Sequence, residues 1–264
     1  MVSAGEQDRP LDSVVQRRRL LTVDGVRIET RYLPPLTQSR SDLAYVIAHG
    51  FTGHWGKPAV QRVAAELNAY GAVLVPDLRG HGGSGGVSTV GDLEVHDIDA
   101  AVMWARALGH ERVVTLGFSM GASIVVRHAA LCGGIDAVAA VSGPARWYYR
   151  GTPAMRRVHW LVETPAGRSF ARRFLGTRIG MDGWDPIPQE PREVAASIAP
   201  IPLLVVHGDA DRYFPVDHGD QLAAAGGEGV TYWLEQGFGH AEAATTPELL
   251  GRIASWLEES ACRS

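Results

Sequence analysis

Residues 113–124 read VVTLGFSMGASI, an apolar strand-like run that passes through Gly-x-Ser-x-Gly into a helical pattern. A serine at such a junction lies on a tight, strained turn, with its hydroxyl beyond the carboxyl end of the sheet. Gly117 and Gly121 suit this turn because strand and helix crowd together there. The stretch therefore predicts Ser119 as a positioned nucleophile, and the alternative is a plain small-residue connection.

Strand-like apolar runs alternate with helical patterns on both sides of this stretch. An Asp-Gly pair at residues 24–25 predicts a hairpin at one edge of the sheet. The order of the remaining runs predicts a mostly parallel, doubly wound α/β sheet of about eight strands with right-handed crossovers. The other predicted strands are residues 43–48, 72–77, 113–118, 135–141, 202–207 and 230–234.

The turn at Ser119 resembles the nucleophile elbow of the α/β-hydrolase superfamily. Asp211 and His240 each follow a predicted strand, and the chain order Ser, Asp, His is typical of that fold. The resemblance implies a catalytic triad in which the His240 imidazole takes the Ser119 proton and the carboxylate orients the imidazole. Asp209 competes for the role of the acid, but Asp211 fits the Gly-x-x-Asp pattern of the family.

Two loops that follow strands complete the resemblance. Residues 49–53 read HGFTG, which implies the Phe51 backbone N–H as one oxyanion donor, beside the Met120 N–H at the elbow. Residues 77–84 read DLRGHGGS, which resembles a structural turn of these hydrolases, so His81 is expected to be a scaffold residue.

The glycines of this turn also fit Gly-x-Gly-x-x-Gly, at Gly80, Gly82 and Gly85. They do not open directly into an apolar helix, so we predict no dinucleotide site and no cofactor. Thr89 and Asp92 have the spacing of a capping box, which predicts that the next helix begins there.

Residues 143–199 interrupt the alternation and resemble the helical cap of the superfamily. The expected division is an α/β-hydrolase core over residues 13–142 and 200–260, with residues 143–199 as a cap or lid. Trp147, Tyr148 and Trp160 are the candidates for the substrate pocket. Eight arginines against two acids between residues 143 and 183 indicate either a solvated helix face or attraction of an anionic substrate, such as an acyl group on CoA or an acyl carrier protein.

Composition excludes several other classes of protein. The net charge of −4 argues against a nucleic-acid partner, and no run approaches the ~20 apolar residues of a membrane span. The polar start and the two cysteines predict a cytoplasmic protein without a disulfide framework, with Cys132 used for packing. Neither His-Glu-x-x-His nor Cys-x-x-Cys occurs, so no metal site is predicted.

The resemblance implies a serine hydrolase acting on a carboxylic ester or thioester through an acyl-enzyme. The same fold also hosts carbon–carbon bond hydrolases and cofactor-free oxygen or peroxide enzymes, and these stay open as alternatives. A non-catalytic binding protein is the third possibility, which the complete set of motifs disfavours. Oligomeric state is not predicted.

Overall fold

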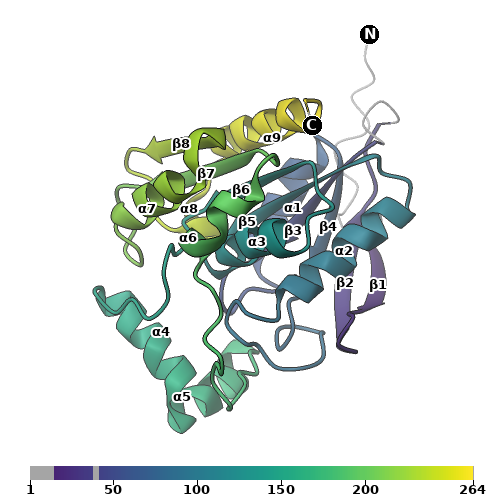
Figure 1. Cartoon of the computed structure of the whole chain (residues 1–264). Coiled ribbons are helices and arrows are strands. Elements are labelled where there is room, and N and C mark those ends of the chain that lie inside the picture. The colour runs from purple at the N-terminus through teal and green to yellow at the C-terminus, as the bar shows by residue number, and fades with distance from the viewer. Residues whose placement is uncertain (1–14, 38–41, 264) are drawn as a thin grey trace.

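The computed structural model describes residues 15–37 and 42–263, and its centre is a sheet of eight strands between two layers of helices (Figure 1). The predicted start of the core at residue 13 lies outside these residues. The strand order is β1-β2-β4-β3-β5-β6-β7-β8. The strands are β1 (Gln16–Leu21), β2 (Arg27–Leu33), β3 (Leu43–Ala48), β4 (Ala72–Pro76), β5 (Arg112–Phe118), β6 (Ala137–Val141), β7 (Leu203–Gly208) and β8 (Val230–Glu235).

The direction of the strands confirms the predicted α/β class. β1 pairs with β2, and β2 with β4, in antiparallel fashion, whereas every pair from β4 to β8 is parallel. The Asp-Gly hairpin therefore forms the predicted edge. Every residue of β3, β4, β6 and β7 is buried, as expected for strands that helices cover on both faces.

Helices cover the two faces of the sheet. α1 (Pro58–Asn68) and α9 (Pro247–Ala261) lie against one face, and α2 (Val95–Ala107), α3 (Met120–Leu131) and α7 (Asp217–Gly226) lie against the other (Figure 1). α1 and α9 both begin with proline, whose fixed φ suits the first helical position. Each layer contributes to its own cluster of buried apolar residues, so the sheet separates two cores.

The start of α2 differs from the prediction. The helix begins at Val95, and the carboxylate of the fully buried Glu94 accepts the backbone N–H groups of Thr89, Val90 and Gly91. Asp92 instead faces Arg127, at 3.2 Å. The capping-box prediction is therefore wrong, because Glu94 holds the loop before the helix rather than capping its first turn.

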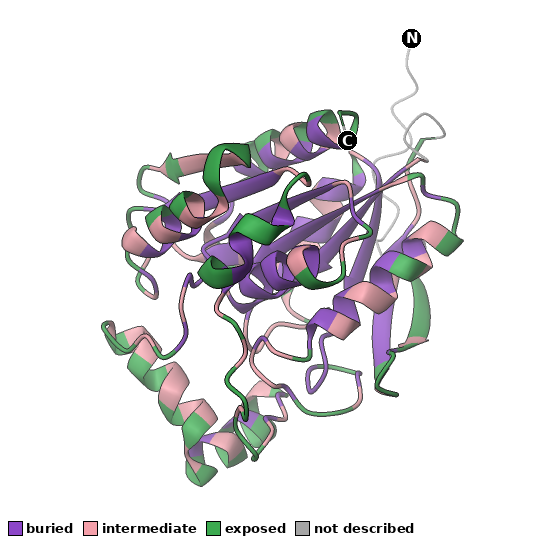
Figure 2. Ribbon diagram, viewed as in Figure 1, coloured by how far each residue is buried: buried purple, intermediate pink, exposed green. Residues whose placement is uncertain are grey.

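The chain leaves the sheet between β6 and β7, over residues 143–199, which we call the inserted segment. It contains α4 (Pro153–Glu163), α5 (Pro165–Phe170), the π-helical turn Ala171–Leu175, α6 (Pro191–Val194) and a 3-10 turn, Ala195–Ile198. α6 packs back on α3 and α7, whereas α4 and α5 project away from the sheet (Figure 1). α4 has no buried residue and α5 has one, Gly167 (Figure 2).

Within residues 15–37 and 42–263, no helix combines the length and the apolar character needed to cross a membrane.

Candidate active site

The turn between β5 and α3 has the strained geometry that its sequence predicts. Ser119 has φ 52° and ψ −116°, a conformation that side chains other than glycine rarely adopt. A Cβ atom at Gly117 would lie 2.2 Å from the Gly121 carbonyl oxygen, and one at Gly121 would lie 2.0 Å from the Ala48 carbonyl oxygen. Both glycines are therefore required by the close approach of β3, β5 and α3.

The structure brings Ser119, His240 and Asp211 together, although they are far apart in the chain. His240 follows β8, and its Nε2 lies 2.9 Å from Ser119 Oγ. Its Nδ1 lies 2.8 Å from Asp211 Oδ2. The three strands that these residues follow, β5, β7 and β8, run parallel in one sheet with β6 between β5 and β7, so their carboxyl ends lie at the same edge.

The surroundings of the two candidate acids differ. The Asp211 side chain is fully buried, and its Oδ1 accepts the backbone N–H groups of Tyr213 and Phe214 at 2.7 and 3.1 Å. Asp209 is exposed and accepts the Gly237 N–H. Asp211 therefore contacts His240 and is held in one orientation, whereas Asp209 serves the turn after β8.

The two expected oxyanion donors face the same space as Ser119. Phe51 and Met120 line the cavity above Ser119, and neither backbone N–H has a hydrogen-bond partner among the residues that the structure describes. Met120 is the first residue of α3, where backbone N–H groups have no acceptor within the helix. Both N–H groups are therefore available to a bound oxygen atom.

His81 and the turn around it form a buried scaffold. His81 Nδ1 contacts the Arg79 carbonyl oxygen at 2.9 Å, and its ring packs against His49 with the ring centroids 5.1 Å apart. Burial lowers the pKa of His49 to about 3, so its imidazole is neutral and its Nε2 accepts the Leu78 N–H. Asp77 accepts the N–H groups of Trp55 and Gly83.

Glu242 is a site residue that the sequence analysis missed. Its Oε1 accepts the Gly50 N–H at 2.6 Å, directly beside Phe51, and its backbone carbonyl is bound by the Arg62 guanidinium. Burial raises the pKa of the Glu242 carboxyl, although the Gly50 N–H and His240 act in the opposite direction. Its only signal in the sequence is its place two residues after His240.

Ring contacts hold His240 in place. The Tyr213 ring stacks on the His240 ring, with the centroids 4.2 Å apart and the planes 27° apart. The Ser142 hydroxyl oxygen accepts the N–H of Ala241, the residue after His240, at 3.1 Å. Ser142 follows β6 and Tyr213 follows β7, whereas His240 follows β8. The position of His240 therefore depends on three strands.

A cavity of about 1640 Å³ opens above Ser119, between the sheet edge and the inserted segment. Trp147 and Tyr148 line this cavity, as expected. Trp160 does not: its side chain is 46% exposed and packs against Phe170 instead. The apolar lining residues from α4 are Met155, Val158, Leu161 and Val162.

Most arginines of the inserted segment have partners within the protein. Arg146 pairs with Asp217 at 3.0 Å, and Arg150 pairs with Glu163. Arg178 binds backbone carbonyl oxygens of the loop after β4. Arg192 pairs with Glu190 at 2.7 Å. The remaining arginines either donate to carbonyl oxygens within the segment, as Arg156 and Arg168 do, or are exposed, as Arg157, Arg172 and Arg173 are.

Comparison with known proteins gives the family. A family model described as the alpha/beta hydrolase family matches residues 45–251. A monoacylglycerol lipase of Mycolicibacterium smegmatis is 30% identical to this chain, over 89% of the chain and 94% of the lipase.

Solved structures share the fold at lower identity. An esterase of Pyrococcus furiosus, Pf2001, has a TM-score of 0.74 at 22% identity, over 96% of this chain and 94% of that one. The alpha/beta hydrolase GrgF from a Penicillium species has a TM-score of 0.73 at 15% identity, over 94% of this chain and 99% of that one. The family match, the related lipase and the eight-stranded sheet agree, and the chain belongs to the alpha/beta hydrolase family.

Proposed function

We propose that this protein is a serine hydrolase that cleaves carboxylic esters through an acyl-enzyme on Ser119. The observation that carries the proposal is the position of the His240 ring, which lies 2.9 Å from the Ser119 hydroxyl and 2.8 Å from the Asp211 carboxylate. A neutral imidazole so placed takes the hydroxyl proton as the oxygen attacks a carbonyl carbon. The buried carboxylate sets the tautomer of His240 and stabilises the imidazolium that forms.

The free backbone N–H groups supply the second requirement of acyl transfer. As the carbonyl carbon becomes tetrahedral, its oxygen gains negative charge, and the Phe51 and Met120 N–H groups donate hydrogen bonds to it. The His240 imidazolium then protonates the leaving alcohol, and the same ring activates the water that releases the acid. Glu242 supports this step by holding Gly50, the residue before Phe51.

The cavity supports an ester with a long apolar acyl chain as the substrate. Its volume of about 1640 Å³ exceeds the ~300–1,000 Å³ that is usual for small-ligand pockets. The apolar face of α4 and the Trp147 ring line it opposite Ser119, so the inserted segment acts as a cap over the acyl chain. The related lipase is named for monoacylglycerol, a neutral ester of this shape.

An acyl group carried by CoA or an acyl carrier protein is less well supported. Four arginines and five acids line the cavity, so its charged groups nearly balance. The ion pairs of Arg146 and Arg150 further reduce the charge offered to an anionic carrier. A neutral thioester would react through the same acyl-enzyme as an ester. The cavity therefore favours a neutral substrate, and it does not distinguish an ester from a thioester.

Mass spectrometry of the trapped intermediate tests the proposal. The protein is mixed with monoacylglycerols and p-nitrophenyl esters of graded chain length, quenched in acid and digested. We expect the acyl mass on the peptide that contains Ser119, and faster turnover of long-chain than of short-chain esters. No turnover of any ester by a protein whose Ser119 fluorophosphonate still labels would favour the carbon–carbon or oxygen chemistry of the fold, and failure of fluorophosphonate to label Ser119 would favour a binding protein.

A salt series tests the charge of the substrate. The value of kcat/KM for an acyl-CoA and for a neutral ester of the same acid is measured as the ionic strength rises. Salt weakens only binding that depends on attraction between exposed charges. Because we propose no such attraction, we expect both kcat/KM values to stay nearly constant. A steep fall for the acyl-CoA alone would restore the carrier-bound substrate.

A further inference from the structure

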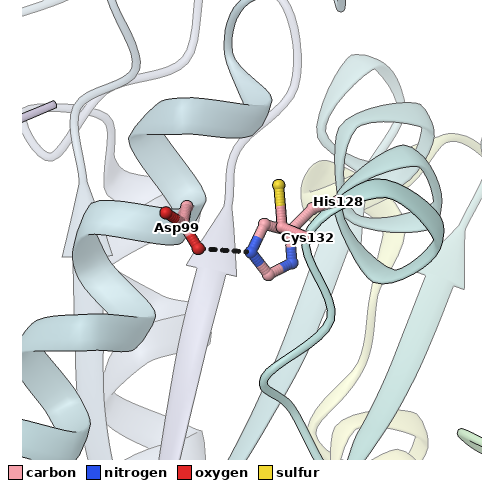
Figure 3. A group of neighbouring side chains, drawn as sticks. All are labelled: Asp99, His128 and Cys132. Atoms are coloured by element: carbon pink, nitrogen blue, oxygen red, sulfur yellow. Dashed lines mark ion pairs between the residues drawn. The ribbon is translucent and has the colours of Figure 1, made fainter. Parts of the chain in front are cut away.

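A second cluster of reactive side chains lies between α2 and α3, away from Ser119 (Figure 3). Asp99 belongs to α2, whereas His128 lies in the last turn of α3 and Cys132, four residues later, follows the end of that helix on the same side. One ligand atom from each side chain lies within 4.8 Å of the other two. His128 is nine residues beyond Ser119, which places it ~14 Å farther along α3 at 1.5 Å per residue.

His128 has an environment that its protein contacts do not explain. Its side chain is fully buried, and both ring nitrogens lack a hydrogen-bond partner. Among the histidines within residues 15–37 and 42–263, no other has both nitrogens buried and unpartnered. The Nε2 atom forms an ion pair with Asp99 Oδ1 at 3.6 Å, a distance that is longer than a hydrogen bond (Figure 3). Burying a ring nitrogen without a hydrogen-bond partner is unfavourable, so a further ligand at this ring would stabilise it.

The three side chains form a donor set that suits zinc. Imidazole nitrogen, thiolate sulfur and carboxylate oxygen bind Zn²⁺ tetrahedrally with bonds of about 2.0–2.3 Å, which places the ligand atoms about 3.3–3.8 Å apart. The 3.6 Å between His128 Nε2 and Asp99 Oδ1 falls in this range.

The remaining two groups are free to adjust. Cys132 is exposed at the end of α3, and Asp99 is 35% exposed, so both can approach an ion whose position the buried ring sets. Their exposure also leaves the fourth position of a tetrahedron open to water. The expected packing role of Cys132 is therefore wrong, because its thiol lies at the surface beside His128.

We propose that Asp99, His128 and Cys132 bind a divalent transition-metal ion of the zinc type, which ties α2 to the end of α3. On binding, the thiol proton of Cys132 leaves to solvent and the sulfur–metal bond forms, while the His128 nitrogen and the Asp99 carboxylate supply lone pairs. The ion takes no part in the reaction at Ser119, because His128 lies ~14 Å farther along α3.

Cobalt titration of the full chain tests the site. Co²⁺ takes the same ligands as Zn²⁺, and a cobalt–thiolate bond gives a charge-transfer band in the near ultraviolet. We expect this band in the native protein and in Cys262→Ser, which removes the other cysteine, and its loss in Cys132→Ser. Asp99→Asn should weaken Co²⁺ binding at least about tenfold, whereas His96→Gln, one turn earlier on α2, should leave it unchanged.

Thermal unfolding with Zn²⁺ provides a second measurement. An ion at 100 times its Kd should raise Tm by roughly 5–10 °C in the native chain and in Cys262→Ser. Asp99→Asn and Cys132→Ser change partly or fully exposed side chains, so both should fold and show little rise. Absence of the band and of the Tm rise in the native protein would overturn the proposal. An equal response in the two ligand variants would also overturn it, because the ion would then bind elsewhere.

Discussion

The carboxyl edge of the sheet and the inserted segment face each other across one cavity, but they are built in opposite ways. The strands behind Ser119 and Asp211 are almost completely buried, whereas α4 has no buried residue (Figure 2). Proton transfer requires atoms held within about 0.5 Å, which a packed sheet edge provides. An apolar acyl chain needs only a surface to cover it, which an exposed helix provides.

This difference predicts that changes at the sheet edge affect catalysis, whereas changes on the inserted segment affect which substrate is accepted. Several hydrogen bonds and the Arg146–Asp217 ion pair join the segment to the core near the cavity, and the Thr152 hydroxyl donates to the Tyr213 carbonyl oxygen at 2.9 Å. The Trp184 indole donates to the Thr89 carbonyl oxygen at 2.7 Å, and Ser88 and Arg178 pair through their backbones. These connections hold the segment over the cavity, although α4 itself has no buried residue.

The largest expected effect is that of Ser119→Ala. We expect kcat to fall by ~10³–10⁶, because the nucleophile is lost while the oxyanion donors and the cavity remain. Ester hydrolysis and circular dichroism of the purified variant provide the measurement. Ser169→Ala, at an exposed position of α5, is the matched control and should retain the native rate. Native activity in Ser119→Ala would mean that Ser119 is not the nucleophile.

The next largest effect distinguishes the two candidate acids. Asp211→Asn should lower kcat by ~10⁴, because an amide does not stabilise the imidazolium and favours the wrong tautomer of His240. Asp209→Asn should cost less than about tenfold, since its amide oxygen still accepts the Gly237 N–H. Steady-state kinetics on one ester compares them, and the reverse order would transfer the role of the acid to Asp209.

A third prediction concerns the inserted segment. Val158→Trp places an indole in the cavity, and we expect kcat/KM for a long-chain ester to fall at least about tenfold while that for an acetate ester stays nearly unchanged. Arg157→Trp adds the same side chain at the neighbouring exposed position and should leave both values as they are. An equal loss on both esters in Val158→Trp would show that α4 does more than cover the acyl chain.

The smallest expected effects are opposite changes in the pH dependence of stability. Burial raises the pKa of Glu242, so the folded state holds this proton more tightly than the unfolded state, and the resulting stability is lost as pH rises through the folded pKa. Burial also raises the pKa of Glu163, but hydrogen bonds from His159 and Arg150 lower it overall. The stability that Glu163 contributes is therefore present above its ordinary pKa of 4.5 and is lost as pH falls through its folded value.

Urea unfolding between pH 4 and pH 8 measures both effects. Glu242→Gln should gain stability relative to the native protein as pH rises, and Glu163→Gln should lose it. The glutamine at position 242 keeps an acceptor for the Gly50 N–H, which separates the effect of charge from that of the hydrogen bond. Changes of the same sign in both variants would contradict the contrast between the two regions.

Local sequence patterns predicted those parts of the structure that depend on neighbouring residues. The apolar runs of β3 and β4 and the Asp-Gly hairpin appear as predicted, and the turn at Ser119 has the expected strain. The prediction for the start of α2 was wrong because a contact formed only in the folded chain determines that loop. Glu94 rather than Asp92 holds the loop before α2, because only the folded chain buries that carboxylate among three backbone N–H groups.

The order of strands and helices, and the strained turn at Ser119, were determined by the sequence alone, because apolar periodicity and the steric needs of glycine act within a few residues. The sequence favoured Asp211 over Asp209 through a family pattern, and the contact of Asp211 with His240 comes from the tertiary structure. Tertiary structure alone decided that Glu242 joins the site and that Trp160 does not line the cavity. It also decided that Asp99 meets His128 and Cys132. These contacts join residues far apart in the chain, and their distances depend on how strands and helices pack rather than on any local pattern.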